Sequence, residues 1–109
     1  MDKNEIFDVS KLGFGLMRLP EKDGEIDYAH VCRMVDKYME AGLNYFDTAY
    51  IYPGSEATLG EILEKNGVRN QVYIATKLPH YLIKSKEKME ALFTEELKRL
   101  RTDHVDYYL

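Results

Sequence analysis

The sequence of 109 residues contains one cysteine, Cys32, and no tryptophan. A lone thiol cannot form an internal disulfide and cannot build a cysteine-based zinc site. His30 and His104 have no metal-ligand spacing to each other or to Cys32. We therefore expect no metal site, and the cysteine usage favours a reducing compartment.

Long apolar runs are also missing. No stretch approaches the ~20 apolar residues that a membrane-spanning helix requires. Residues 1–11 carry charged side chains throughout and lack the apolar segment of a secretory signal. We expect a cytoplasmic protein with no membrane partner.

Positive charge is scarce, with 15 Lys and Arg against 19 Asp and Glu, a net charge of -4. The two signs are interspersed, so there is no basic stripe for phosphate contacts, and we expect no nucleic-acid partner. A chain that is 45% hydrophobic and 31% charged has the composition of a globular protein. Its length fits a single domain over residues 1–109.

Apolar residues recur at helical spacing in three segments, residues 27–41, 56–66 and 86–101. Each has a residue able to cap its N-terminus, and the first two are followed by a glycine that can end a helix. The N-cap candidates are Asp27, Ser55 and Ser85, and the glycines are Gly42 and Gly67.

Short apolar runs without clear alternation lie around these helices, at residues 12–15, 44–49, 72–76 and 104–109. Such runs suit strands that are buried on both faces of a parallel sheet. They start about 30 residues apart, the length of one strand-helix-strand unit. The sequence therefore predicts an α/β fold of order βαβαβαβ.

Two architectures share this order, an open doubly wound sheet and a (β/α)8 TIM barrel. Gly13 and Gly15 begin like a dinucleotide fingerprint, but Arg18 stands where its third glycine belongs, and Pro20 follows instead of a helix start. A flavodoxin-type domain would also need a phosphate-binding loop here, and residues 16–20 lack its glycines and hydroxyls. In a barrel, four strands are half of the whole, so we expect the first half of a barrel.

Two charged residues end buried strands. Asp47 follows the second predicted strand and Lys77 the third. Burial of either charge without a partner would be costly, and an ion pair between neighbouring strand ends would satisfy both. On spacing alone, a structural salt bridge and a catalytic pair are equally good interpretations.

Tyr52 lies five residues after Asp47, at the barrel end where active sites form. A phenol with a pKa of ~10 is a poor acid at neutral pH. A nearby ammonium would lower that pKa and make Tyr52 a proton donor to a developing alkoxide. Taken alone, one of nine tyrosines would be interpreted as a packing residue.

Residues 47–52, followed by Ser55 and Glu56, resemble the signature of the aldo-keto reductase family. Residues 12–15, 75–78 and 105–109 resemble its first, third and fourth barrel strands, and residues 41–46 resemble the turn into its second strand. The resemblance covers nearly the whole chain in the right order.

The resemblance implies a (β/α)8 barrel that binds NADP(H) and transfers hydride to an aldehyde or ketone. Tyr52 matches the family's general acid, Lys77 the residue that lowers its pKa, and Asp47 the residue paired with that lysine. The residues that match cofactor contacts are Gly15, Leu16, Met17, Arg18 and Asp47. The family's catalytic histidine and later cofactor loops would fall beyond residue 109, so the isolated chain is expected to be inactive.

Two hypotheses remain open. The chain belongs to a carbonyl reductase, or it is a non-catalytic half-barrel or regulatory module that works by association. The unpaired edges of a half-barrel predict self-association or pairing with a missing C-terminal half. Retention of Asp47, Tyr52 and Lys77 favours the enzyme. Residues 11–20 and 34–45 also resemble a bacterial subgroup that appends a ferredoxin-like iron-sulfur domain. The substrate, and NADPH against NADH, stay open.

Overall fold

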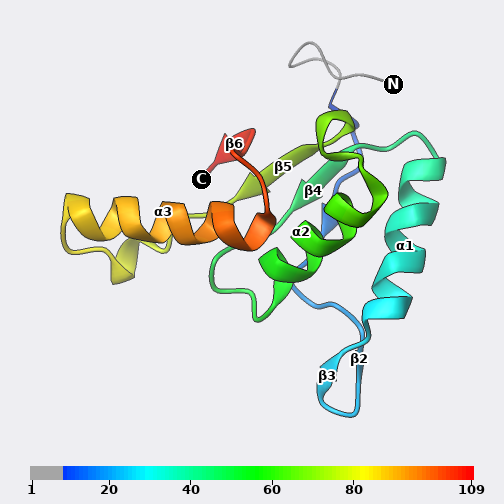
Figure 1. The fold of residues 1–109 in the computed structure, drawn as a ribbon, viewed down its shortest axis with the longest axis horizontal. Coiled ribbons are helices and arrows are strands. Elements are labelled where there is room, and N and C mark those ends of the chain that lie inside the picture. Colours follow the sequence, from blue (N-terminus) through cyan, green and yellow to red (C-terminus); the bar gives the residue numbers. More distant parts are fainter. Residues whose placement is uncertain (1–8) are drawn as a thin grey trace.

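The computed structural model describes residues 9–109, which form a parallel sheet covered by helices (Figure 1). The sheet strands are β1 (Phe14–Gly15), β4 (Tyr45–Asp47), β5 (Tyr73–Thr76) and β6 (Tyr107–Tyr108). The helices are α1 (Tyr28–Glu40), α2 (Ser55–Asn66) and α3 (Lys86–Leu100). A hairpin of β2 (Glu21–Lys22) and β3 (Glu25–Ile26) precedes α1, and two 3-10 turns, η2 (Arg69–Gln71) and η3 (His80–Leu82), flank β5.

The four sheet strands lie in the order β1-β4-β5-β6, and every neighbouring pair is parallel. Each new strand is thus added beside the one before it. A doubly wound sheet would reverse its strand order at a switch point, whereas a barrel continues in one direction. The predicted βαβαβαβ order is confirmed, with the hairpin as an addition.

The two faces of the sheet differ in character. Phe46 pairs with Ile74 in register on the face toward the helices, and both are fully buried. The core on this face consists of Leu16, Val31, Val35, Phe46, Leu59, Ile62, Leu63, Val72, Ile74 and Leu100. On the opposite face, the ring of Tyr107 lies 6.0 Å from that of Tyr45 and 6.3 Å from that of Tyr73. Because side chains alternate along a strand, Asp47 shares this second face.

Capping follows the sequence at two helices and departs from it at the third. Asp27 accepts a hydrogen bond from His30 N, and Ser85 accepts one from Lys88 N. Ser55 is not a cap, so that prediction is wrong. Gly54, with φ 69°, takes the N-cap position of α2, and the hydroxyl of Ser55 lies 2.6 Å from Thr48 Oγ1 instead. Ser55 therefore serves as the hydrogen-bond partner of the buried Thr48 hydroxyl, directly after β4.

The hairpin was not predicted, although its turn has a recognisable sequence. Asp23 and Gly24 have φ values of 54° and 82°. Two consecutive residues with positive φ are the requirement of a type I′ hairpin turn, for which Asp-Gly is a favoured pair. The hairpin lies next to the loop after β1 (Figure 1).

An arginine cluster ties together the beginnings of β5 and β6. The guanidinium group of Arg69 donates to the carbonyl oxygens of Val72 and His104, at 3.1 and 2.8 Å. It also lies 3.1 Å from the carboxylate of Asp106, which in turn accepts from Ile74 N at 2.9 Å.

Among the helices of residues 9–109, none is both long and apolar enough to cross a membrane.

Candidate active site

An ion pair forms where β4 and β5 end. Lys77 Nζ lies 2.6 Å from Asp47 Oδ1 and donates a second hydrogen bond to the carbonyl oxygen of Thr48 at 2.9 Å. The side chains of Lys77 and Asp47 are 33% and 38% exposed, so the pair is partly open to solvent. The pair that strand-end spacing predicted is present.

The surroundings of Lys77 favour its charged form. Burial lowers the pKa of Lys77, but the hydrogen bond to Asp47 and the negative charge of that carboxylate raise it, with further raising contributions from Tyr52. The net pKa lies above the ordinary value of 10.5. Lys77 is therefore a fixed positive charge at neutral pH.

Tyr52 lies beside this charge. Lys77 Nζ is 5.0 Å from the centroid of the Tyr52 ring. Two backbone hydrogen bonds shape the loop that carries Tyr52, because its N–H donates to Ala49 O at 3.2 Å and its carbonyl accepts from Ser55 N at 3.1 Å. The three residues singled out in the sequence thus lie together at the carboxyl ends of the strands.

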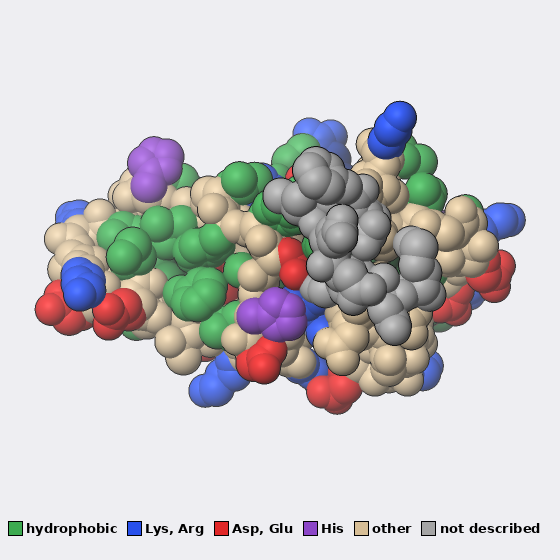
Figure 2. Space-filling model, turned by 90° about the horizontal axis from the view of Figure 1, so that it is seen from above, with side chains coloured by type: hydrophobic (Ala, Val, Ile, Leu, Met, Phe, Trp, Pro, Cys, Tyr) green, Lys and Arg blue, Asp and Glu red, His purple; other side chains and the backbone are tan. Residues whose placement is uncertain are grey.

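A hollow of about 310 Å³ opens next to Tyr52 and Lys77. Its other lining residues are mostly apolar: Ala49, Ile51, Leu78, Pro79, His80, Tyr81 and Leu109. Among these lining residues, Tyr81 and Leu109 are exposed. In Figure 2, hydrophobic side chains gather toward the end of the molecule occupied by α3. His80 is exposed on its loop and meets the Tyr81 ring edge-on, with centroids 5.8 Å apart. Sequence reasoning missed this lining, because η3 gives no periodic signal.

Tyr50, two residues before Tyr52, is not among the residues that line this hollow. Its ring lies 4.3 Å from the guanidinium carbon of Arg99, and its carbonyl oxygen accepts from Arg99 Nη1 at 3.3 Å. Tyr50 is therefore held against α3 as a packing aromatic.

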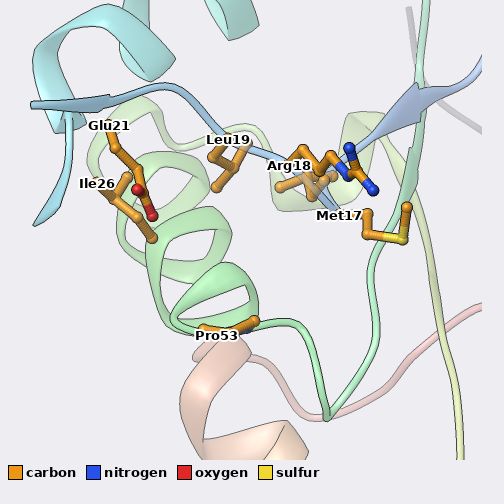
Figure 3. A pocket seen from close by; sticks show the side chains of 7 residues that line it. Met17, Arg18, Leu19, Glu21, Ile26 and Pro53 are labelled. Carbon is orange, nitrogen blue, oxygen red and sulfur yellow. The ribbon is translucent and has the colours of Figure 1, made fainter. Parts of the chain in front are cut away.

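A second hollow, of about 390 Å³, lies between the loop after β1 and the loop before α2. Figure 3 shows Met17, Arg18, Leu19, Glu21 and Ile26 on one side of it and Pro53 on the other. Leu16 also lines it, but its side chain is buried in the core and its N–H donates to Asp47 O at 2.9 Å. Three of the residues predicted to contact a cofactor, Leu16, Met17 and Arg18, therefore line one hollow.

Space for a bound group also exists at Gly15. Gly15 pairs in register with Asp47, and a Cβ atom built on it would meet no protein atom within 4 Å. The end of β1 thus faces open space beside the carboxylate of Asp47. An exposed arginine, a carboxylate and an uncrowded glycine at strand ends fit a phosphate-bearing, ribose-containing cofactor such as NADP(H).

The sequence model of the aldo/keto reductase family matches residues 11–109. The chain belongs to this family. It is 41% identical over 80 residues to methylglyoxal reductase DkgB of Salmonella typhi, a match that covers 72% of this chain and 29% of that protein. It is 28% identical to the aryl-alcohol dehydrogenase [NADP(+)] of Phanerodontia chrysosporium, over 92% of this chain and 32% of that protein.

Solved aldo-keto reductase structures share the fold. The chain superposes on the aldo-keto reductase of Klebsiella pneumoniae in complex with NADPH with a TM-score of 0.76 and 26% identity, covering 92% of this chain and 34% of that one. The predicted aldo-keto reductase barrel is confirmed as the fold, and residues 9–109 form part of such a barrel. The chain spans about a third of the length of these relatives.

Proposed function

We propose that the protein containing this chain reduces an aldehyde or ketone with NADPH and uses Tyr52 as its proton donor. The observation that carries the proposal is the position of Lys77, whose ammonium lies 2.6 Å from Asp47 and 5.0 Å from the Tyr52 ring centroid. A plain strand-end salt bridge would not need a phenol beside it. The cofactor in the Klebsiella relative, NADPH, supports the choice of reductant.

The chain's own residues divide the work. NADP(H), when bound, supplies or accepts the hydride. Met17 and Arg18 would hold it from the loop after β1, with Leu16 contributing through its backbone and Gly15 leaving the space that the group needs. Asp47 would accept from a ribose hydroxyl, because a carboxylate has acceptor sites beyond the one that Lys77 occupies.

The carbonyl substrate would lie in the 310 Å³ hollow, with its oxygen toward Tyr52. The phenol of Tyr52 would donate its proton to the negative charge that develops on the carbonyl oxygen during reduction. The fixed ammonium of Lys77 stabilises the phenolate that remains. Asp47 keeps that ammonium aimed, and solvent returns the proton to Tyr52.

Residues 1–109 alone are proposed to be inactive and to associate. Four strands are half of an eight-stranded barrel, and β1 and β6 lie at the edges of the described sheet. Edge strands offer unpaired backbone groups to another chain. We expect the isolated segment to elute as an oligomer in size-exclusion chromatography with light scattering and to leave NADPH unconsumed. A stable monomer, or turnover of an aldehyde, would contradict this.

The test of the proposed function uses the full-length protein and follows NADPH oxidation with an aldehyde. Tyr52→Phe keeps the ring and removes the proton, so kcat should fall by ~10²–10⁴ while NADPH still binds. Tyr50→Phe is the matched control, since it removes a hydroxyl from a ring packed against Arg99 and should leave kcat unchanged. Equal rates for both variants would refute the role of Tyr52.

A further inference from the structure

A second cluster of ionisable groups lies on the helix side of the sheet. Glu56 of α2 and Glu96 of α3 are 1% and 0% exposed, and both reach Thr76 of β5, which is also fully buried. Glutamate is rarely buried to this extent unless it is paired. The proposed mechanism leaves these two carboxyl groups without a role.

The hydrogen bonds in this cluster require a proton count. Thr76 Oγ1 lies 2.7 Å from Glu56 Oε2 and 3.0 Å from Glu96 Oε2. A threonine hydroxyl has one proton to donate, so it cannot donate to both carboxylates at once. The second contact becomes a hydrogen bond when one carboxyl group is protonated and donates to Thr76. Two ionised carboxylates on one buried hydroxyl would repel each other strongly.

Two further titratable or charged groups of residues 9–109 face the pair. Arg99 of α3 reaches Glu56 Oε1 with its Nη1 at 3.4 Å, but it is shared with the exposed Glu95, also at 3.4 Å. Tyr108 of β6 donates its hydroxyl to Glu96 Oε1 at 2.6 Å. That short distance is typical of a hydroxyl that donates to an ionised carboxylate. The contacts thus suit one ionised and one protonated carboxyl group.

The pKa shifts agree with one ionised and one protonated carboxyl group. Burial, together with the hydrogen bond to Glu96, raises the pKa of Glu56 to about 8, although Thr76 and Arg99 act in the opposite direction. Burial and the neighbouring Glu96 also raise the pKa of Tyr108 above its ordinary value, so the phenol remains a donor.

The pair is connected to Lys77 along two routes. Thr76 directly precedes Lys77 in the chain. Ser55 directly precedes Glu56, and its hydroxyl lies 2.6 Å from that of Thr48, whose carbonyl oxygen accepts from Lys77 Nζ at 2.9 Å. The backbone that carries Lys77 and the carbonyl of Thr48 that accepts from its ammonium are therefore both linked to the carboxyl pair.

We propose that Glu56 and Glu96 share one proton at neutral pH and that this protonated pair positions Lys77. The two glutamates are positioning residues, since they touch neither hollow. The importance of Lys77 rests on the proposed function, whereas the shared proton does not. The two parts of the proposal are therefore tested by separate measurements on the full-length protein.

The shared proton is tested by infrared spectroscopy. A protonated buried carboxylic acid has a carbonyl band distinct from that of carboxylates, and we expect this band at neutral pH and its loss as the pH rises through about 8. Glu56→Gln and Glu96→Gln should each abolish it, because the amide then donates to Thr76, and the Thr76 hydroxyl can donate to the one remaining carboxylate without a shared proton. Glu90→Gln, at an exposed position of α3, is the control and should leave it. Absence of the band in the wild type at neutral pH, or its survival in either variant, overturns the proposal.

Positioning is tested by NMR of the Lys77 side chain, which needs no turnover. We expect the Lys77 Cε and Nζ signals of the wild type to shift when the pair loses its proton, well below the pH at which Lys77 itself titrates. In Glu96→Gln that step should vanish. Identical titrations in the two proteins would overturn the positioning role. Failure of the proposed function would appear differently, as a wild type that does not reduce carbonyls with NADPH while both spectroscopic results stand.

Discussion

Lys77 and Asp47 meet at 2.6 Å although they are 30 residues apart in the sequence. The register of the sheet explains the contact. Asp47 pairs with Ala75, and Lys77 comes two residues after Ala75, so all three side chains leave the same face. A slip of β5 by one residue would turn Lys77 toward the helices. The site therefore depends on strand register as much as on residue identity.

The charge on Lys77 should depend on Asp47. Asp47→Asn removes the negative charge beside Lys77 and leaves only a neutral acceptor for its hydrogen bond, so the pKa of Lys77 should fall, as measured by NMR titration of the Lys77 Cε signal. Because the folded pKa is raised, the charge on Lys77 contributes stability that is present below its ordinary pKa of 10.5 for as long as Asp47 is ionised. That stabilisation is lost as the pH rises through the folded pKa. An unchanged Lys77 titration in Asp47→Asn would contradict this account.

Ser55 should act through Thr48 and not as a helix cap. Ser55→Ala leaves the buried Thr48 hydroxyl without its partner, which should lower the free energy of unfolding by about 1–3 kcal/mol. A double-mutant cycle with Thr48→Val in urea unfolding should give a coupling energy within the ~0.5–3 kcal/mol seen for residues in contact. Additive effects would show that the hydroxyls of Ser55 and Thr48 do not stabilise each other.

Gly60 should resist substitution by alanine. A Cβ atom at this position would collide with the backbone oxygen of Arg99 and lie 2.7 Å from the Cα of Leu100. Alanine in a helix normally gains up to about 1 kcal/mol over glycine. Here overpacking against α3 should reverse the sign and cost about 1–3 kcal/mol. The neighbouring Glu61→Ala, at an exposed position, should change the free energy of unfolding by about 0.5 kcal/mol or less. A stabilised Gly60→Ala variant would refute the close approach.

Gly15 should matter for cofactor binding and not for folding. A Cβ atom there meets no protein atom within 4 Å, and the branched side chain of valine would extend from it into the space proposed for NADP(H). We expect Gly15→Val to weaken NADPH binding about tenfold or more, equivalent to ~1.4 kcal/mol, in a fluorescence titration. Gly15→Ala should have a smaller effect, and both variants should melt like the wild type. Equal NADPH affinity in the wild type and both variants would contradict the proposal that the cofactor binds next to Gly15.

The sequence predicted the features that depend on local pattern. Helices were recognisable from periodicity and from Asp27 and Ser85 as caps, and parallel strands from short apolar runs about 30 residues apart. Charges at the ends of neighbouring strands predicted the Asp47–Lys77 contact, because parallel strands align their carboxyl ends. The roles of Asp47, Tyr52 and Lys77, and of the residues matched to cofactor contacts, stay predictions.

Features that depend on tertiary partners were beyond the sequence. In α3, Met89 lies at helical spacing from the apolar residues Leu92 and Phe93, yet Met89 is 37% exposed and Glu96 is buried. The hydroxyls of Thr76 and Tyr108, which come from two other strands, make that burial possible. Ser55 was wrongly predicted to be a helix cap for the same reason, since no local sequence pattern indicates Thr48 as its hydrogen-bond partner.

The contacts of Arg69 and the Asp47–Lys77 ion pair lie at different ends of β5. Arg69 holds the beginning of β5 and the segment before β6, while Lys77 follows the end of β5, so the structural contacts of Arg69 and the proposed catalytic charge lie at opposite ends of the same strand. Engineering for heat resistance can therefore be directed at the Arg69 end without altering the groups that would face a substrate. If the proposed function holds, substitutions that change substrate specificity belong in the loops after β1, β4 and β5, which line the two hollows.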